Sequence, residues 1–345
     1  MQNSKTSDAD RFSIRRDKII SNLSKRGIDG LLVTNPINVR YLTGFTGGDG
    51  YLLLKKQHSV LISDGRYSLQ IQEECQGIDV LIASQQEVFP KSVCTQINKQ
   101  TGKIGIESES ITLMNSEKLK AASPNTEFVP TINEVASLRQ IKDQFEISEI
   151  RKAIVAAHNA FTDVRNMIAK GELGVRLSDV SELSVRDELE YRLRKHGASE
   201  KSFASIVCSG QRAALPHGIP TANTIGKESH LLIDWGAIVN GYMSDLTRVI
   251  ILKENNKKLK DIYNIVLKAQ TEAIKAIKPG VICQEIDAIA RGIISDSGYA
   301  KNFNHGLGHS FGLEIHENPR FNTTDKTVLK TGMVMTVEPG IYIKG

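Results

Sequence analysis

The sequence predicts two domains, an α/β domain over residues 1–135 followed by an α+β domain over residues 136–345. Two observations support this organisation. The chain has 345 residues, a length more typical of two domains than of one. Its first part alternates short apolar runs with segments of helical spacing, whereas its second part begins with a long amphipathic helix. The change of pattern falls near Pro130–Asn133, and we therefore place the boundary at about residue 135.

Short apolar runs bounded by Gly, Pro, Asn or Asp predict buried strands in the first domain. They lie at Leu31–Val33, Tyr51–Leu54, Val60–Ile62, Val80–Ile82 and Ile104–Ile106. Helical spacing of apolar residues marks Asp17–Lys25 and Tyr67–Cys75. This alternation is typical of an α/β domain and does not select one fold of that class.

The second domain begins with a predicted helix over 140–170, whose apolar residues recur every three or four positions. A second helix over 178–195 stops at Gly197. The elements that follow are predicted as strands at 202–209 and 231–252, helices at 257–277 and 284–295, and strands at 310–317 and 333–343. The order helix, helix, strands therefore occurs twice.

Composition and charge exclude several classes of protein. Hydrophobic residues make up 40% and charged residues 24%, as in an ordinary globular chain rather than a disordered one. The net charge is only +5, and the one dense basic cluster, Lys253–Lys260, is better explained as a solvated helix face than as a nucleic-acid site. Four scattered cysteines, a polar N-terminus and the lack of a long apolar run predict a soluble cytoplasmic protein with no membrane partner.

Two aspartates lie in a segment that predicts a β-hairpin. Asn240-Gly241 is a strong turn signal, and that turn places Asp234 opposite Thr247. Asp245 then shares a face of the sheet with Asp234, within reach of a metal pair. Because a lone carboxylate is costly in an apolar strand, a cation must compensate Asp234. A salt bridge to Arg248 or a turn-capping role would also satisfy this requirement, so the local sequence leaves both readings open.

Histidines are concentrated farther along the chain. Three of the eight lie between His305 and His316. Gly306 and Gly308 favour a loop that leads into a strand over a helix with two histidines on one face. The helical HExxH zinc motif is absent from the sequence. Three histidines in so short a segment favour a functional site over isolated structural roles.

Two further candidates depend on their neighbours. Glu338 ends an apolar segment immediately before Pro339-Gly340, where an exposed turn residue is an equally good explanation. His217 lies on a loop between Pro216 and Gly218, where a functional histidine is plausible but not required.

The combined donor set is rich in oxygen, with two Asp, at least one Glu and one or two His. Such a set suits Mn²⁺, Co²⁺ or Zn²⁺ in a two-metal hydrolase. Histidines that are not ligands would move protons or stabilise a tetrahedral intermediate.

Ordered motifs along nearly the whole chain resemble those of one superfamily. They are Asn38–Gly47, Ser63–Tyr67, Leu138–Asp143, Ser202–Gly210, Pro216-His217, Ile233–Gly236 and Ser244–Arg248. The spacings of 11 residues from Asp234 to Asp245 and 29 from His309 to Glu338 fit the same pattern. The chain resembles the creatinase/prolidase/methionine-aminopeptidase superfamily of "pita-bread" metalloenzymes, peptidase family M24. The similarity is greatest to its Xaa-Pro peptidase branch, which includes aminopeptidase P and prolidase.

The resemblance implies a creatinase-type N-terminal α/β domain and a pita-bread catalytic domain. It further implies two divalent metal ions, with Mn²⁺ expected first and Co²⁺ or Zn²⁺ as alternatives. The implied ligands are Asp234, Asp245, His309 and Glu338, with Asp245 bridging the two ions. The expected reaction is hydrolysis of the bond between an N-terminal residue and proline by a metal-bridging water. Expected partners are short peptides with proline second and other copies of the chain, as a homodimer or larger homo-oligomer, and not nucleic acid.

The resemblance also assigns roles to residues around the metals. His217 and His316 match histidines that contact the substrate and stabilise the intermediate. Glu338 has a further role beside the nucleophilic water. His305 matches a histidine that lines the substrate pocket, and Tyr342 a tyrosine near the metal centre.

One feature of the family pattern is missing. The family has a fifth ligand, a second Glu on a closing strand, whereas this sequence ends at Gly345, seven residues after Glu338. We therefore expect the catalytic domain to lack its last strand and the 345-residue chain to be inactive or nearly so, while a longer form would be active.

Two other functions were compared with the peptidase. A catalytically impaired or non-enzymatic pita-bread binding protein is the main alternative, because the fifth ligand is absent. A creatinase-like amidinohydrolase is disfavoured, because that branch lacks the metal ligands that are present here. The sequence does not separate a dipeptidase from an aminopeptidase, since they share these motifs.

Overall fold

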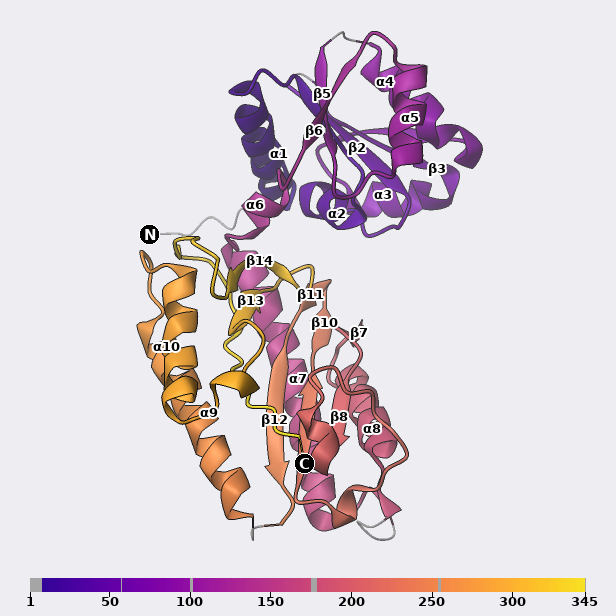
Figure 1. Cartoon of the computed structure of the whole chain (residues 1–345). Coiled ribbons are helices and arrows are strands. Elements are labelled where there is room, and N and C mark those ends of the chain that lie inside the picture. The colour runs from indigo at the N-terminus through magenta and orange to yellow at the C-terminus, as the bar shows by residue number, and fades with distance from the viewer. Residues whose placement is uncertain (1–7, 57, 100–101, 175–178, 254–255, 345) are drawn as a thin grey trace, which may run out of the picture. The chain divides into compact units, whose positions relative to one another are not determined.

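The computed structural model describes residues 8–56, 58–99, 102–174, 179–253 and 256–344. It divides into two compact units, Met1–Leu138 and Arg139–Gly345, each with its own sheets and core (Figure 1). The sequence analysis placed the division at residue 135. A short helix, α6 (Ala136–Arg139), spans the point at which the units separate.

The first unit is built on one six-stranded mixed sheet in the order β4-β3-β2-β1-β5-β6. Its strands are β1 (Gly30–Val33), β2 (Gly50–Lys55), β3 (Val60–Asp64), β4 (Asp79–Ala83), β5 (Lys103–Glu107) and β6 (Glu127–Thr131). The five predicted strands are therefore confirmed. The sixth, β6, was not predicted, and it lies at the edge of the sheet, where Pro130 removes no ladder hydrogen bond.

Helices pack on the sheet of the first unit. The helices are α1 (Asp8–Ser24), α2 (Pro36–Thr43), α3 (Ser68–Glu74), α4 (Val93–Ile97) and α5 (Leu113–Ala122). Side chains of α4 and α5 share one apolar core with the central strands, and α1 and α2 also pack on the sheet. Local sequence sets the limits of α2: the Asn35 side chain accepts the Ile37 N–H at its start, and Gly44 ends it at φ 85°.

The second unit begins with the 27-residue helix α7 (Gln144–Lys170). It starts four residues later than the sequence analysis predicted, because Asp143 and Glu146 form a capping box at its first turn. Gly171, at φ 70°, ends it. Fully buried alanines along one face, such as Ala153 and Ala157, allow strands to approach the helix closely.

Two three-stranded antiparallel sheets pack beside α7, in the orders β12-β9-β8 and β11-β10-β7. Their strands are β7 (Glu200–Lys201), β8 (Ile206–Ser209), β9 (His230–Trp235), β10 (Ala237–Val239), β11 (Tyr242–Met243) and β12 (Leu246–Ile251). Trp235 stacks on Phe161 of α7 with ring centroids 4.7 Å apart, and its indole N–H donates to the carbonyl of Ala157. The predicted strand at 202–209 is wrong over its first four residues, since β8 begins at Ile206.

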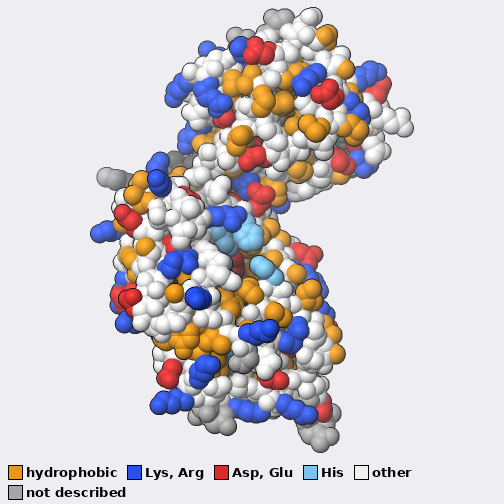
Figure 2. All heavy atoms as spheres, viewed as in Figure 1, with side chains coloured by type: hydrophobic (Ala, Val, Ile, Leu, Met, Phe, Trp, Pro, Cys, Tyr) orange, Lys and Arg blue, Asp and Glu red, His pale blue; other side chains and the backbone are white. Residues whose placement is uncertain are grey.

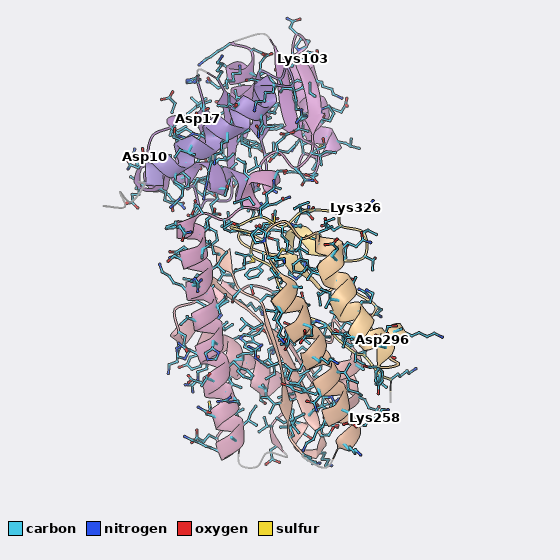
Figure 3. All side chains as sticks on the ribbon, turned by 90° about the vertical axis from the view of Figure 1, so that its left-hand side faces the viewer. Asp10, Asp17, Lys103, Lys258, Asp296 and Lys326 are labelled. Carbon is cyan, nitrogen blue, oxygen red and sulfur yellow. The ribbon has the colours of Figure 1, made fainter. Side chains whose placement is uncertain are left out.

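The remaining helices are α8 (Glu182–Lys195), α9 (Lys257–Ala276) and α10 (Cys283–Asp296). Position 178, the predicted start of the second helix, lies outside the described residues, and α8 begins where Ser181 caps it. α9 and α10 pack against each other, and Figure 3 shows them on the opposite side of the strands from α7. Among the described residues, no helix is both long and apolar enough to cross a membrane.

Two predicted strands near the C-terminus are corrected. Residues 310–317 are not one strand. Ser310 ends β13 (Gly308–Ser310), Glu317 begins β14 (Glu317–Phe321), and residues 311–316 connect these two paired strands. Residues 333–343 form no strand beyond an isolated bridge from Met335 to Ser310. Their backbone follows 302–309, and the N–H groups of Thr336 and Glu338 donate to the carbonyls of His309 and Leu307, but the His309 N–H donates to the Thr336 hydroxyl instead of a backbone carbonyl.

A buried carboxylate fixes one loop of the second unit. Glu182, at the start of α8, is fully buried. Its oxygens accept the backbone N–H groups of Ser209 and Thr221, both hydroxyls of those residues, and the guanidinium of Arg212 at 3.1 Å. Burial by itself would raise the pKa of this carboxyl, but these donors outweigh it and hold the pKa below its ordinary value of 4.5. The loop between Ser209 and Thr221, which carries His217, is therefore held at both ends.

We expect Glu182→Gln to lower the free energy of unfolding by about 2 kcal/mol at pH 7, because an amide places N–H groups against donors. Since the folded-state pKa is depressed, the charge of Glu182 stabilises the fold fully above its unfolded pKa, and this stabilisation is lost as the pH falls through the folded pKa. Denaturant unfolding of both proteins at pH 7 and pH 3.5 checks this. The difference between them should narrow at the lower pH, and a constant difference would contradict the role of the charge.

Candidate active site

Successive side chains of β9 point alternately into the core and away from it. Leu231, Ile233 and Trp235 are fully buried, so Asp234 lies on the opposite face of the strand. The predicted register is confirmed, because Asp234 pairs with Thr247 of β12. The turn between β10 and β11 is formed by Asn240 and Gly241 at φ 49° and 80°, as a tight hairpin turn of this type requires.

Three side chains from distant parts of the sequence meet on this face. Asp245 lies just before β12, His309 is in β13, and Glu338 is in the extended C-terminal segment. One ligand atom from each lies within 4.8 Å of the others. His309 Nε2 is 3.5 Å from Asp245 Oδ2 and 3.2 Å from Glu338 Oε1. The sequence placed all three among its candidate ligands.

Asp234 is a fourth candidate ligand beside this cluster. Its Oδ1 is buried and has no hydrogen-bond partner among the described residues. Burial raises the pKa of Asp234 to about 7, and the charge of Glu338 adds to that effect. The pKa of Asp245 is also raised to about 7, first by burial and then by the charges of Asp234 and Glu338. A salt bridge from Asp234 to Arg248 is excluded, because Arg248 is exposed and donates to the Thr247 carbonyl.

This geometry fits a bound cation. Asp234, Asp245 and Glu338 repel one another, and Asp234 has an oxygen that no donor of the described residues satisfies, so the site requires positive charge or must take up protons. A divalent ion would supply that charge and displace the protons. Carboxylate oxygens with a single imidazole nitrogen suit Mn²⁺, Co²⁺ or Zn²⁺.

Thr336 positions two members of the cluster and was not identified from the sequence. Its hydroxyl donates to Glu338 Oε1 at 2.8 Å and accepts the backbone N–H of His309 at 2.9 Å. For Glu338, burial raises the pKa, but the bond and the charge of His309 and the Thr336 hydroxyl outweigh it and lower the pKa. The two-residue spacing of Thr336 and Glu338 in an extended segment was the available sequence signal.

His305 and Tyr342 form a pair close to the acids. His305 Nδ1 lies 2.7 Å from the Gly306 carbonyl, which only accepts, so Nε2 of the neutral ring accepts the Tyr342 hydroxyl at 3.0 Å. Asn302 fixes the backbone of Tyr342 through two hydrogen bonds. Burial raises the pKa of Tyr342 to about 12, and the charges of Glu338 and Asp234 add to the rise. The phenol is therefore a proton donor at neutral pH.

The two other predicted histidines lie at the exposed side of the cluster. The His316 ring is 4.5 Å from the His309 ring, centroid to centroid, in an edge-to-face arrangement. Burial lowers the pKa of His316, and the positive charges of His309, Arg320 and His217 lower it further. His217 is exposed on its loop. Figure 2 shows histidine side chains on one face of the second unit, with acidic side chains recessed beside them.

Both parts of the chain match known protein families. Residues 15–141 match the creatinase/prolidase N-terminal domain, and residues 148–345 match metallopeptidase family M24. The chain is 37% identical to an Xaa-Pro dipeptidase of Pyrococcus furiosus over 331 residues, which cover 95% of this chain and 90% of that protein.

Solved structures agree with this match. The Xaa-Pro dipeptidase from Bacillus anthracis superposes with a TM-score of 0.90 at 38% identity, covering 97% of this chain and 91% of that one. The X-Pro aminopeptidase from Thermotoga maritima superposes with a TM-score of 0.86 at 32% identity, covering 96% and 91%. The predicted fold class, a creatinase-type domain followed by a pita-bread domain, is confirmed. The chain belongs to metallopeptidase family M24.

Proposed function

We propose that this protein hydrolyses the peptide bond between an N-terminal residue and proline, with two divalent metal ions held by Asp234, Asp245, His309 and Glu338. The observation that carries the proposal is the partly buried cluster of three carboxylates around His309, in which Asp234 Oδ1 has no donor among the described residues. The names of similar proteins, an Xaa-Pro dipeptidase and an X-Pro aminopeptidase, support the choice of substrate.

In this proposal the metal ions, when bound, acidify a water molecule and polarise the scissile carbonyl. The Thr336 hydroxyl holds Glu338 Oε1, so the other oxygen of that carboxylate accepts a proton from the attacking water. His217 and His316, at the exposed side of the cluster, donate hydrogen bonds to the carbonyl oxygen as it gains negative charge. The His305–Tyr342 pair lines the substrate pocket and keeps its proton on the phenol oxygen.

Several finer features belong to the same proposal. Mn²⁺ is the expected metal because the family resemblance favours it, and the oxygen-rich donor set also suits Co²⁺ or Zn²⁺. The expected substrates are short peptides with proline in second position, and the expected assembly is a homodimer or larger homo-oligomer. The expected location is the cytoplasm, in keeping with four buried, free cysteines.

A second candidate function is that of an impaired enzyme or a non-enzymatic peptide-binding protein. It is favoured by one observation: the described residues bring together Asp234, Asp245, His309 and Glu338, four of the five metal ligands that the family resemblance implies. A site formed by these four alone would have one negative charge and one shared oxygen fewer, so one of the two ions would bind much more weakly.

The metal content and the hydrolytic activity of one preparation distinguish these functions. The protein is dialysed against Mn²⁺, its metal content is measured by mass spectrometry, and Gly-Pro and a longer Xaa-Pro peptide are offered as substrates. Close to two ions per chain with turnover support the peptidase. One ion or none without turnover contradicts activity of this chain and supports the impaired or binding protein. Cleavage of Gly-Pro alone would indicate a dipeptidase.

We expect Asp245→Asn to weaken Mn²⁺ binding by more than about 100-fold, because the substitution removes a charged ligand from the centre of the cluster. Equilibrium dialysis or calorimetry measures this independently of activity. Asp261→Asn, an exposed position of α9, is the matched control and should bind Mn²⁺ as the unsubstituted protein does. Equal affinity in the two variants would exclude Asp245 as a ligand.

We expect His316→Ala to lower kcat for an Xaa-Pro peptide by about 10²–10³-fold, the usual effect of losing a hydrogen-bond donor to the developing oxyanion. Its Mn²⁺ affinity should change little, since His316 is assigned to the substrate and not to the metals. His158→Ala, at an exposed position of α7, provides the control. A parallel loss of Mn²⁺ affinity in His316→Ala would show that this residue ligates metal instead.

A further inference from the structure

A buried ionic network lies under the hairpin that carries His309, and the proposed reaction makes no use of it. Lys142 and Arg139 are almost fully buried, with side chains 1% and 3% exposed, and Glu317 is 6% exposed. Lys142 Nζ lies 3.1 Å from Glu317 Oε2, and Arg139 bonds Glu317 Oε1. Arg139 also contacts Glu314 at 2.7 Å. All of these residues are in the second unit.

Lys142 contacts both strands of the hairpin at the place where their pairing is irregular. His309 pairs with Arg320, but the next residue, Ser310, pairs with Glu317. A regular antiparallel ladder would place Pro319 opposite Ser310, so two residues of β14 bulge out between the pairs. The Lys142 ammonium donates to Ser310 Oγ at 2.8 Å and to Glu317 on the other strand. It therefore links the two residues that define the shifted register.

The shifted register determines where two site histidines lie. His309 directly precedes Ser310, and His316 directly precedes Glu317. Because the strands are antiparallel, His309 and His316 flank the Ser310–Glu317 pair on opposite sides, and their ring centroids are 4.5 Å apart. In a regular ladder, with Pro319 opposite Ser310, His316 would lie two positions farther from His309.

The connecting loop is closed tightly around the same charges. The Glu314 N–H donates to Glu317 Oε1, and the Gly312 N–H donates to the Glu314 carbonyl. A Cβ atom at Gly312 would lie 3.1 Å from the Glu317 carboxylate and 3.2 Å from Lys142 Cε, so both side chains would have to shift by a few tenths of an ångström to admit it.

A backbone hydrogen bond also fixes the position of Lys142. Its N–H donates to the Gly332 carbonyl, just before the segment that carries Thr336 and Glu338. It also directly precedes Asp143, the N-cap of α7. The Lys142 backbone is therefore fixed just before a long helix, and its ammonium is a buried group and not a surface charge.

We propose that Lys142 is a positioning residue for the metal site: through Ser310 and Glu317 it fixes the shifted register of β13 and β14, and so the placement of His309 and His316. This inference rests on the proposed metal function. It assigns a role in the site to the Leu138–Asp143 motif, which the sequence analysis identified only as part of the family resemblance.

The test compares Lys142→Met and Ser310→Ala with a matched control, Lys152→Met. Lys152 is on α7, is 55% exposed and pairs with Glu149, so its loss removes an ion pair far less buried than that of Lys142. Mn²⁺ dissociation constants are measured by electron paramagnetic resonance, and the visible spectrum of the Co²⁺-loaded proteins reports the ligand geometry. Thermal unfolding is recorded in parallel.

We expect Lys142→Met and Ser310→Ala to raise the Mn²⁺ dissociation constant by about 10–100-fold and to alter the Co²⁺ spectrum, as the loss of groups that orient ligands usually does. Lys152→Met should match the unsubstituted protein. Ser310→Ala removes a single hydroxyl and decides the question if Lys142→Met does not fold.

Two outcomes would overturn the inference, and they are distinguishable. Unchanged affinity and spectrum in a variant with a lower unfolding temperature would mean that the network stabilises the fold without positioning the site. That result would leave the proposed function intact. Absence of Mn²⁺ binding by the unsubstituted protein would contradict the proposed function itself, and the inference with it.

Discussion

Electrostatic repulsion among three partly buried carboxylates is the constraint on which the rest of the site depends. Asp234, Asp245 and Glu338 converge around His309, and the raised pKa values of the two aspartates show that the protein alone does not stabilise all three charges. A fold selected only for stability would pair these groups with cations. Here the missing partner is the metal that the family resemblance implies, so the cost of assembling the acids is offset when the ion binds.

The contrast with other buried carboxylates of the second unit supports this interpretation. Glu182 and Glu317 are at least as buried, yet hydrogen-bond donors and basic side chains lower the pKa of each. Both satisfied carboxylates also lie beside segments that carry site histidines, the loop of His217 and the hairpin of His309 and His316. The scaffold thus uses compensated carboxylates to hold the residues of a site in which the charges of Asp234 and Asp245 are left uncompensated.

The wrong strand predictions near the C-terminus have one physical origin. Phe311 and Leu313 are buried in the loop between β13 and β14, and the apolar residues of 333–343 are partly buried in the core that contains α9 and α10, in neither case by a regular ladder. Apolar alternation reports burial, which a hairpin with a bulge or an irregular extended segment satisfies as well as a strand does.

The sequence by itself determined the features that depend on neighbours along the chain. These include the Asn240-Gly241 turn with Asp234 opposite Thr247, the long helix, and the family motifs that mark the candidate ligands. Only the tertiary structure decided the features that depend on distant residues. It placed Asp245 beside His309 and Glu338, left Asp234 Oδ1 without a donor among the described residues, and brought Lys142 to Ser310 and Glu317. A linear pattern records residue types and spacing, whereas a charge is paired or unpaired only once packing has chosen its neighbours.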